Sequence, residues 1–386
     1  MRIRRVRFEH FGGIIGTENP ESLMWVDRDY LRSRGFDGGP VWRGIDLDHL
    51  SGPVEMEITI TTRCNLQCPC CYTSATGDGH DVPLSAVIKS LDVAASMNVF
   101  HVAFGGGEPL CHPDLIHMGR AAQQRDLLPS FTTNGVLVTA QWAAEASGIF
   151  SRVNVSIDLP GGQRDTRMPL HRSLDAVRTL ASARIVTGCN LILTDDIVPQ
   201  LDSVFSQVSQ AGADSLMLLR AKPSGRGGDT YHNMRLSTER QRALLPLLLT
   251  LSKAHNLPFH LDCALAPLLM TSGVSRDLLD TLGAYGCIAG DLLVTVDAEG
   301  MVHPCSHLDH VVGRVEALPQ LWKDPLAWGG LRERTSMLTG RCAGCGVRDL
   351  CRGGCPVTNS YYDLDLREPD PDIECRRVRF EPLSQP

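Results

Sequence analysis

Hydrophobic and polar positions along the chain change their pattern near residue 55. Before that point, short apolar runs flank Gly12-Gly13 and predict two short strands followed by a short helix. The two strands would run from Arg5 to Phe11 and from Leu23 to Val26. We therefore expect residues 1–54 to form a small hairpin-like N-terminal appendage, with either a capping role or a role in binding a peptide leader.

From Met56 onward, short apolar runs alternate with longer segments of helical periodicity. This alternation is typical of repeated β/α units around a parallel sheet. Six units predict a partial (β/α)6 TIM barrel over residues 55–225, an α/β fold whose site would lie at the carboxyl ends of the strands. The six strands are predicted at Met56–Thr61, Val99–Phe104, Ser130–Thr133, Val153–Ile157, Ile185–Leu193 and Ser215–Leu219.

Beyond the predicted barrel, the pattern becomes helical and then largely aperiodic. The segment Thr238–His255 predicts one long helix within a helical bridging region that we place at 226–284. Residues 285–386 have few long periodic runs and contain many cysteines. Bound metal would therefore have to supply much of the folding free energy of this last domain.

Composition limits the possible partners and locations. The chain of 386 residues is 43% hydrophobic, carries a formal net charge of −7 and has no long basic run, which disfavours nucleic acid as a partner. The most apolar stretch, Leu244–Leu251, is too short to span a membrane, and the basic N-terminus lacks the apolar run of a secretory signal. We expect a cytoplasmic protein whose fourteen cysteines serve as ligands more often than as disulfides.

Three cysteines lie in the loop that follows the first predicted barrel strand. Cys64, Cys68 and Cys71 have the spacing C-x3-C-x2-C. Three thiolates in one loop can hold three corners of a [4Fe-4S] cube and leave the fourth iron without a protein ligand. Zinc is the less favoured alternative, because zinc sites favour paired C-x2-C units. The spacing resembles that of the radical S-adenosylmethionine (SAM) enzymes.

Three further motifs follow successive predicted strands in the order found in that family. They are Gly105-Gly106-Gly107-Glu108, Thr133-Asn134, and Ser156 with Asp158. Each alone is consistent with an ordinary turn, but together they strengthen the resemblance. It implies that the glycine-rich motif and its glutamate hold the amino group of SAM, and that the later polar groups face its methionine and ribose. It also places Arg167 and Arg220 near the SAM carboxylate, with a structural salt bridge as an equal alternative for each. The implied SAM contacts are Gly105, Gly106, Gly107, Glu108, Thr133, Asn134, Ser156, Asp158, Arg167 and Arg220.

The C-terminal cysteines resemble the SPASM domain, which carries auxiliary [4Fe-4S] clusters. The resemblance implies an outer cluster on Cys342, Cys345, Cys351 and Cys375, and an inner cluster on Cys287, Cys305 and Cys355. The inner set has only three thiolates, because Leu293 occupies the position six residues after Cys287 where many relatives have a further cysteine. The inner cluster would then have an open site or take a fourth ligand from Cys263, Asp291, His303 or His307.

The whole pattern resembles most closely the mycofactocin and pyrroloquinoline quinone peptide maturases. This resemblance implies reductive cleavage of SAM and hydrogen abstraction from a ribosomally made precursor peptide. The outcome would be oxidation, crosslinking, decarboxylation or epimerisation. Two alternatives stay open: a SPASM oxidase acting on a sugar, aminoglycoside or nucleoside, and a noncatalytic zinc scaffold. The expected partners are the precursor peptide, an electron donor such as flavodoxin or ferredoxin, and a separate leader-binding protein.

Epimerisation would require a thiol that returns a hydrogen atom to the substrate. Four cysteines lie outside the implied ligand sets: Cys70, Cys111, Cys189 and Cys263. Cys70 replaces the aromatic or histidine residue usual in the family, so it is either a packing residue below the adenine or a redox-active thiol. Cys189 lies in the fifth predicted strand, where alternation would direct it into the barrel or towards the helices, and a buried structural role is favoured.

Overall fold

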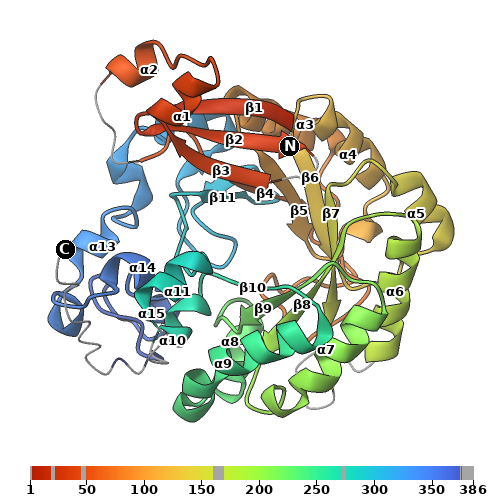
Figure 1. The fold of residues 1–386 in the computed structure, drawn as a ribbon. Helices are drawn as coiled ribbons and strands as arrows, with labels where there is room; N and C mark the ends of the chain where they lie inside the picture. Colours follow the sequence, from red (N-terminus) through yellow and green to blue (C-terminus); the bar gives the residue numbers. More distant parts are fainter. Residues whose placement is uncertain are drawn as a thin grey trace.

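The computed structural model describes residues 2–18, 22–44, 49–159, 169–270, 275–373 and 375. At its centre, six consecutive parallel strands form the predicted partial (β/α)6 barrel (Figure 1). They are β4 (Glu55–Thr61), β5 (His101–Gly106), β6 (Leu128–Thr133), β7 (Arg152–Ile157), β8 (Thr187–Leu193) and β9 (Ser215–Arg220). The outer side is covered by α3 (Leu84–Ser96), α4 (Leu115–Gln123), α5 (Ala140–Ala146), α6 (Leu170–Ser182) and α7 (Leu201–Gln210).

Side chains alternate along these strands between the helices and the barrel interior. In β4 the helix-facing residues Met56, Ile58 and Ile60 belong to the main hydrophobic core. The residues between them have the opposite direction, so Glu55 and Glu57 lie on the interior face. The barrel interior is therefore lined with polar groups that can contact a ligand.

The central sheet extends beyond the six predicted strands at both edges. β10 (Phe259–Leu261) is parallel to β9 at one edge, and β11 (Leu293–Val296) is parallel to β4 at the other. β12 (Met301–His303) and β13 (Gly313–Arg314) then continue antiparallel. These strands were not predicted because two to four residues are too short to show a periodic pattern. The C-terminal region is thus hydrogen-bonded directly to the barrel.

The N-terminal appendage has three antiparallel strands, so the prediction of two strands was wrong. They are β1 (Arg2–Glu9), β2 (Gly12–Glu18) and β3 (Ser22–Asp27). Gly12-Gly13 begins the middle strand instead of forming a turn, and the buried side chains of Ile14 and Ile15 follow it. A Cβ atom on Gly12 would lie 2.2 Å from the carbonyl oxygen of Val26, so the glycine permits close approach of β3.

The bridging region is helical, and its longest helix has the predicted bounds. α9 (Thr238–His255) begins after Ser237, whose side chain accepts a hydrogen bond from the backbone N–H of Arg240.

No helix in the described part of the chain is long and apolar enough to cross a membrane. The remaining helices before the cysteine-rich region are α1 (Arg28–Ser33), α2 (Pro40–Arg43), α8 (Gly227–Met234), α10 (Ala266–Leu269) and α11 (Arg276–Thr281), with the 3-10 turns η1 (Pro109–Cys111) and η2 (Val198–Gln200).

The cysteine-rich region lies on the side of the barrel opposite α5 and α6 (Figure 1). Its helical segments are short, as the aperiodic sequence predicted. They are α12 (Leu318–Leu321), α13 (Arg334–Met337), α14 (Arg348–Cys351) and α15 (Pro356–Tyr361), with η3 (Val315–Ala317), η4 (Pro325–Trp328) and η5 (Gly340–Cys342).

Candidate functional site

The loop between β4 and α3 carries the first three cysteines of the predicted site. Cys64, Cys68 and Cys71 are all partly exposed free thiols. The backbone N–H of Cys64 donates to the carbonyl of Thr76 at 2.8 Å, and that of Cys71 donates to the carbonyl of Cys68 at 3.2 Å. These bonds fix the start and the middle of the loop. The donor set suits a [4Fe-4S] cluster with three protein ligands.

Arg226 anchors this loop from the other side of the barrel. Its Nε donates to the carbonyl of Cys68 at 3.1 Å, and its Nη2 donates to the carbonyl of Ala75 at 3.0 Å. Gly225, at φ +53, brings the backbone so close that a Cβ atom would lie 2.5 Å from the carbonyl oxygen of Tyr72. The sequence analysis did not single out Arg226, although its glycine-rich setting was a usable signal.

The buried carboxylate of Glu108 connects two of the predicted SAM-binding motifs. Its Oε1 accepts a hydrogen bond from Thr133 Oγ1 at 2.7 Å, and its Oε2 accepts one from the backbone N–H of Asn134 at 2.7 Å. Asn134 Nδ2 in turn donates to Oδ1 of Asn65, in the cysteine loop, at 2.7 Å. The ends of β5 and β6 and the cysteine loop therefore form one hydrogen-bonded unit.

Two glycines before Glu108 are required by close backbone packing. A Cβ atom on Gly106, which has φ +113, would lie 2.1 Å from the carbonyl oxygen of Thr61. A Cβ atom on Gly107 would lie 2.0 Å from that of Arg63. Gly105 is on the interior face, where a Cβ atom would lie 2.9 Å from Oε1 of Glu57. The chain can run against the start of the cysteine loop only because these side chains are absent.

The ends of β7 and β8 present further polar groups to the barrel interior. Ser156 pairs in register with Asn190, and Asp158 follows immediately after β7, where its Oδ1 accepts from the N–H of Leu159 at 2.9 Å. Within the described residues, Oδ1 of Asn190 is buried without a hydrogen-bond partner, although its Nδ2 donates to Thr132 Oγ1 at 3.3 Å. The Oδ1 atom of Asn190 can therefore accept a hydrogen bond from a ligand, and the sequence analysis did not single this residue out.

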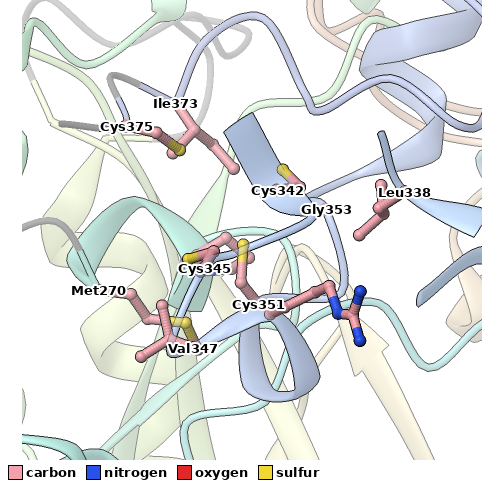
Figure 2. A pocket seen from close by; sticks show the side chains of 11 residues that line it. Met270, Leu338, Cys342, Cys345, Val347, Cys351, Gly353, Ile373 and Cys375 are labelled. Carbon is pink, nitrogen blue, oxygen red and sulfur yellow. The ribbon is translucent and has the colours of Figure 1, made fainter. Parts of the chain in front are cut away.

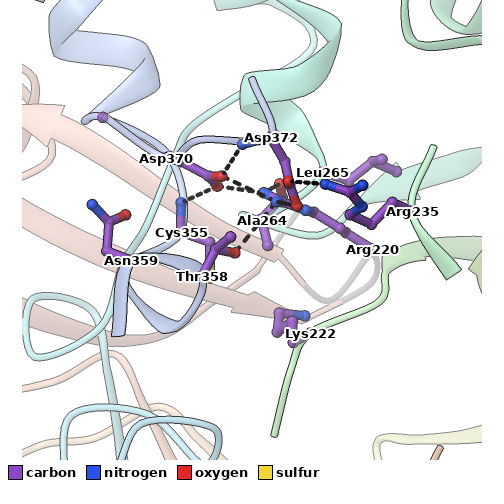
Figure 3. Close-up of polar contacts among 12 residues, drawn as sticks. Arg220, Lys222, Arg235, Ala264, Leu265, Cys355, Thr358, Asn359, Asp370 and Asp372 are labelled. Atoms are coloured by element: carbon purple, nitrogen blue, oxygen red, sulfur yellow. Dashed lines mark hydrogen bonds and ion pairs between the residues drawn. The ribbon is translucent and has the colours of Figure 1, made fainter. Parts of the chain in front are cut away.

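Of the two arginines expected near the SAM carboxylate, the structure describes only Arg220. Arg167 lies outside the described residues, so its role stays a prediction. Arg220 is buried in an ion-pair network with the cysteine-rich region (Figure 3). Its guanidinium donates to Asp370 Oδ2 at 2.5 Å and to Asp372 Oδ2 at 3.0 Å, and also to Tyr231 at 3.1 Å. The structure thus has the salt bridge that the sequence left as the alternative.

The four thiols predicted for the outer cluster line a single cavity (Figure 2). The side chains of Met270, Leu338, Val347 and Ile373 form much of the remaining wall. An apolar cavity surrounded by four cysteines suits an iron–sulfur cluster with four thiolate ligands. These cysteines are Cys342, Cys345, Cys351 and Cys375.

Of the three thiols predicted for the inner cluster, Cys355 is buried, and Cys287 and Cys305 are partly exposed. Burial and interaction with Cys287 and Cys355 raise the pKa of Cys305 to about 12. Two of the suggested fourth ligands have other partners. The carboxylate of Asp291 accepts from Arg352 Nη1 at 2.8 Å, and His303 Nε2 lies 2.8 Å from Oδ2 of Asp297.

A cavity of about 330 Å³ is lined both by the cysteine loop and by Cys305 of the inner thiol set. The cysteine loop and β5 contribute Tyr72, Thr73 and Gly106 to its wall. Residues 305–309 and Glu57 also line it, and the ring of His307 lies against that of Tyr72, with 4.5 Å between the ring centroids. Burial raises the pKa of Glu57, whereas hydrogen bonds from neighbouring hydroxyl groups and the charge of Lys222 lower it.

The remaining thiols differ in their relation to this cavity. Cys189 pairs in register with Val155 and Leu216 and belongs to the hydrophobic core, so it faces the helices. Burial raises its pKa to about 12. Cys70 packs against the cluster formed by Ala221, Tyr231 and Met234. None of Cys70, Cys111, Cys189 and Cys263 is among the described residues that line the cavity.

Comparison with known proteins gives a consistent assignment. Mycofactocin maturase MftC of Mycobacterium tuberculosis (strain CDC 1551 / Oshkosh) is 29% identical over 352 residues, which cover 86% of this chain and 85% of the relative. AdoMet-dependent heme synthase of Methanosarcina barkeri (strain Fusaro / DSM 804) is 24% identical over 316 residues, covering 76% of this chain and 88% of the relative.

A solved structure shares the fold over almost the whole chain. Streptococcus suis SuiB bound to its precursor peptide SuiA has a TM-score of 0.74 at 16% sequence identity, and the match covers 97% of this chain and 100% of SuiB. Residues 58–197 match the family model described as the radical SAM superfamily, and this range contains the three loop cysteines, Glu108 and Asn134. This match and the similarity to a maturase indicate an enzyme whose residues 58–197 are similar to the radical SAM superfamily.

Proposed function

We propose that the protein is a maturase that modifies a ribosomally made precursor peptide. The proposal is supported by the similarity to MftC, which is named a maturase, and by the shared fold of SuiB, which was solved with a precursor peptide. When bound, SAM and a reduced [4Fe-4S] cluster would supply a 5′-deoxyadenosyl radical, which removes a hydrogen atom from an unactivated carbon of the substrate.

The chain's own residues would hold and orient these groups. Cys64, Cys68 and Cys71 would ligate the cluster. The glycine backbone before Glu108 would approach the amino group of SAM, and the turn that Glu108 fixes would hold Asn134 against the methionine. Ser156 and Asp158, at the end of β7, would face the ribose. The buried Oδ1 of Asn190 is aligned with Ser156 and would accept a hydrogen bond from the same ligand.

The main structural support for a peptide maturase is the position of the cavity, which borders both the implied SAM site and the inner thiols. Its wall joins Gly106, beside the implied SAM site, to Cys305, in the inner thiol set. A substrate in this cavity would therefore contact both the site of hydrogen abstraction and a buried auxiliary iron–sulfur cluster. Cys305 is the only cysteine among the described lining residues and is itself an implied ligand. This favours a net oxidation, such as crosslinking or decarboxylation, over epimerisation by a free thiol.

The partners follow from the same proposal. The radical cluster and the two auxiliary clusters would need an external electron donor such as flavodoxin or ferredoxin. A separate leader-binding protein would present the peptide, because the described residues of the appendage form three strands and two short helices. All fourteen cysteines are free in the structure, which supports a cytoplasmic, reducing environment.

The first experiment is a search for a short peptide gene beside this gene, followed by anaerobic reconstitution and reduction of the protein in the presence of SAM and that peptide. Three cubane clusters predict about 12 irons per chain, and changing Cys64, Cys68 and Cys71 to Ala should remove about 4 of them. Deuterium placed on the peptide should appear in 5′-deoxyadenosine. Deuterium transfer from a sugar or nucleoside, and none from the peptide, would contradict the proposal.

A further inference from the structure

We propose that Cys263 is the fourth protein ligand of the inner auxiliary cluster. This thiol comes from the bridging region, directly after β10, and not from the C-terminal cysteine array. The inference rests on the proposed function only in assuming that the inner thiols hold a cluster. It deepens that function by specifying how the cluster can act on the substrate.

The turn that carries Cys263 packs against Cys355. The backbone N–H of Leu265 donates to Oδ1 of Asp262 at 2.6 Å, which closes the turn around Cys263. The next residue, Ala264, packs in one buried cluster with Cys355. This packing places the turn that carries Cys263 beside Cys355.

The ion pair of Arg220 joins these two segments a second time (Figure 3). Its Nη1 donates to the carbonyl oxygen of Ala264 at 3.4 Å and to Asp370 Oδ2 at 2.5 Å. The same Oδ2 atom accepts from the backbone N–H of Cys355 at 3.0 Å. One guanidinium and one carboxylate thus connect the residue after Cys263 to Cys355.

Cys263 also shares its electrostatic environment with the inner thiols. Its thiol interacts with those of Cys287 and Cys355, and Cys305 interacts with the same two groups. Lys222, whose Nζ lies 2.5 Å from Asp262 Oδ2, interacts with Cys263 and Cys355. The four thiols, of which Cys355 is buried and the others are partly exposed, therefore lie in one region beside the ammonium group of Lys222. A cation there would offset part of the charge of a thiolate-bound cluster.

His307 is the main competitor for this coordination position. Its ring Nδ1 is buried without a hydrogen-bond partner in the part of the chain that the structure describes. However, its ring lies on Tyr72, with 4.5 Å between the ring centroids, and lines the substrate cavity. Its backbone N–H donates to Cys305 Sγ at 3.4 Å. We assign His307 to the cavity wall and Cys263 to the cluster.

Four cysteine ligands would leave no iron of the inner cluster open to the substrate. The inner cluster could then exchange electrons with a substrate in the cavity but could not coordinate it. With three ligands the opposite would hold, and an open iron could bind a donor atom of the substrate. The identity of the fourth ligand therefore decides between electron transfer and direct coordination.

The test uses the full chain with Cys64, Cys68 and Cys71 changed to Ala, so that only auxiliary clusters remain. After reconstitution with iron and sulfide, ¹³C-cyanide is added, and its coupling to the reduced clusters is measured by pulsed EPR. We expect no cyanide coupling in this protein and a coupled signal once Cys263→Ala is added. Cys189→Ala is the matched control, because Cys189 is a buried thiol that faces the helices, and it should leave the spectrum unchanged.

Cyanide coupling before Cys263 is changed, or none after Cys263→Ala, would overturn the assignment. Coupling produced by His307→Ala and not by Cys263→Ala would assign the ligand to His307 instead. If Cys263→Ala does not fold, Cys263→Ser keeps an oxygen ligand and should fold with a shifted Mössbauer signal for one iron. An unshifted spectrum in that variant would likewise contradict the proposal. These readouts need no substrate, so a failed peptide assay would not affect them.

Discussion

Thr133 Oγ1 donates a 2.7 Å hydrogen bond to the carboxylate of Glu108, which joins the ends of two neighbouring barrel strands. The same carboxylate accepts from the backbone N–H groups of Asn134 and Leu110, at 2.7 and 3.1 Å. Glu108 is only 2% exposed, so these donors compensate much of the cost of burying its charge. These hydrogen bonds therefore shape the edge of the barrel at which the proposed SAM site lies.

Replacing Thr133 by Val should weaken SAM binding by about tenfold, whereas Thr133→Ser should have little effect. Valine keeps the branched shape but removes the shorter of two hydrogen bonds to Oε1 of Glu108 and leaves only the one from the N–H of Leu110, a loss of about 1–3 kcal/mol. Serine keeps the hydroxyl group. The dissociation constant for SAM, measured with the reconstituted cluster, distinguishes the two variants. Equal affinities in Val and Ser variants would show that this hydrogen bond does not order the site.

Arg226→Ala should reduce the stability of the radical cluster without affecting the auxiliary clusters. The variant loses the two hydrogen bonds that hold the backbone of the cysteine loop at Cys68 and Ala75. We expect cluster loss during gel filtration to reach about 4 irons per chain. Arg178→Ala is the control, because Arg178 forms only an exposed ion pair with Asp175. Uniform loss of iron from all clusters would argue against a local anchor.

Arg220→Met should destabilise the fold but leave SAM affinity within about twofold, once the protein is folded. Removing one partner of a buried ion pair costs about 3–5 kcal/mol, because the carboxylate of Asp370 is left uncompensated. Thermal unfolding should show the loss, and Arg220→Met with Asp370→Leu should recover part of it. A large drop in SAM affinity at unchanged thermal stability would instead support the SAM contact that the family resemblance implied.

The barrel could be predicted from sequence because its strands are long enough to alternate and its helices long enough to show periodicity. The carboxyl-end location of the motifs followed from the same pattern, and Glu108 and Asn134 do meet at that edge. The contacts of Arg226 and Arg220 could not be predicted in this way. Each joins residues about 150 positions apart, and no local pattern encodes such a pairing.

The middle N-terminal strand was missed for a different physical reason. Consecutive glycines usually indicate a turn, but Gly12 is needed here because β3 passes too close for a side chain. Likewise, the orientation of Cys189 depends on strand register, which only pairing with Val155 and Leu216 reveals.

Glu55→Gln should stabilise the protein at pH 8 and have little effect near pH 4.5. Burial, with a smaller contribution from the nearby Glu57 carboxylate, raises the pKa of Glu55 from 4.5 to about 7. The folded state therefore binds more protons than the unfolded state between these pH values, and the free energy of unfolding falls as the pH rises through this window. Glutamine does not titrate, so the variant keeps its free energy of unfolding as the pH rises. The variant should therefore exceed the wild type in free energy of unfolding by about 1–3 kcal/mol at pH 8. Thermal unfolding of both proteins from pH 4.5 to 8 measures it, with Glu299→Gln as a control at an exposed carboxylate. A difference that does not change with pH would show that Glu55 titrates normally.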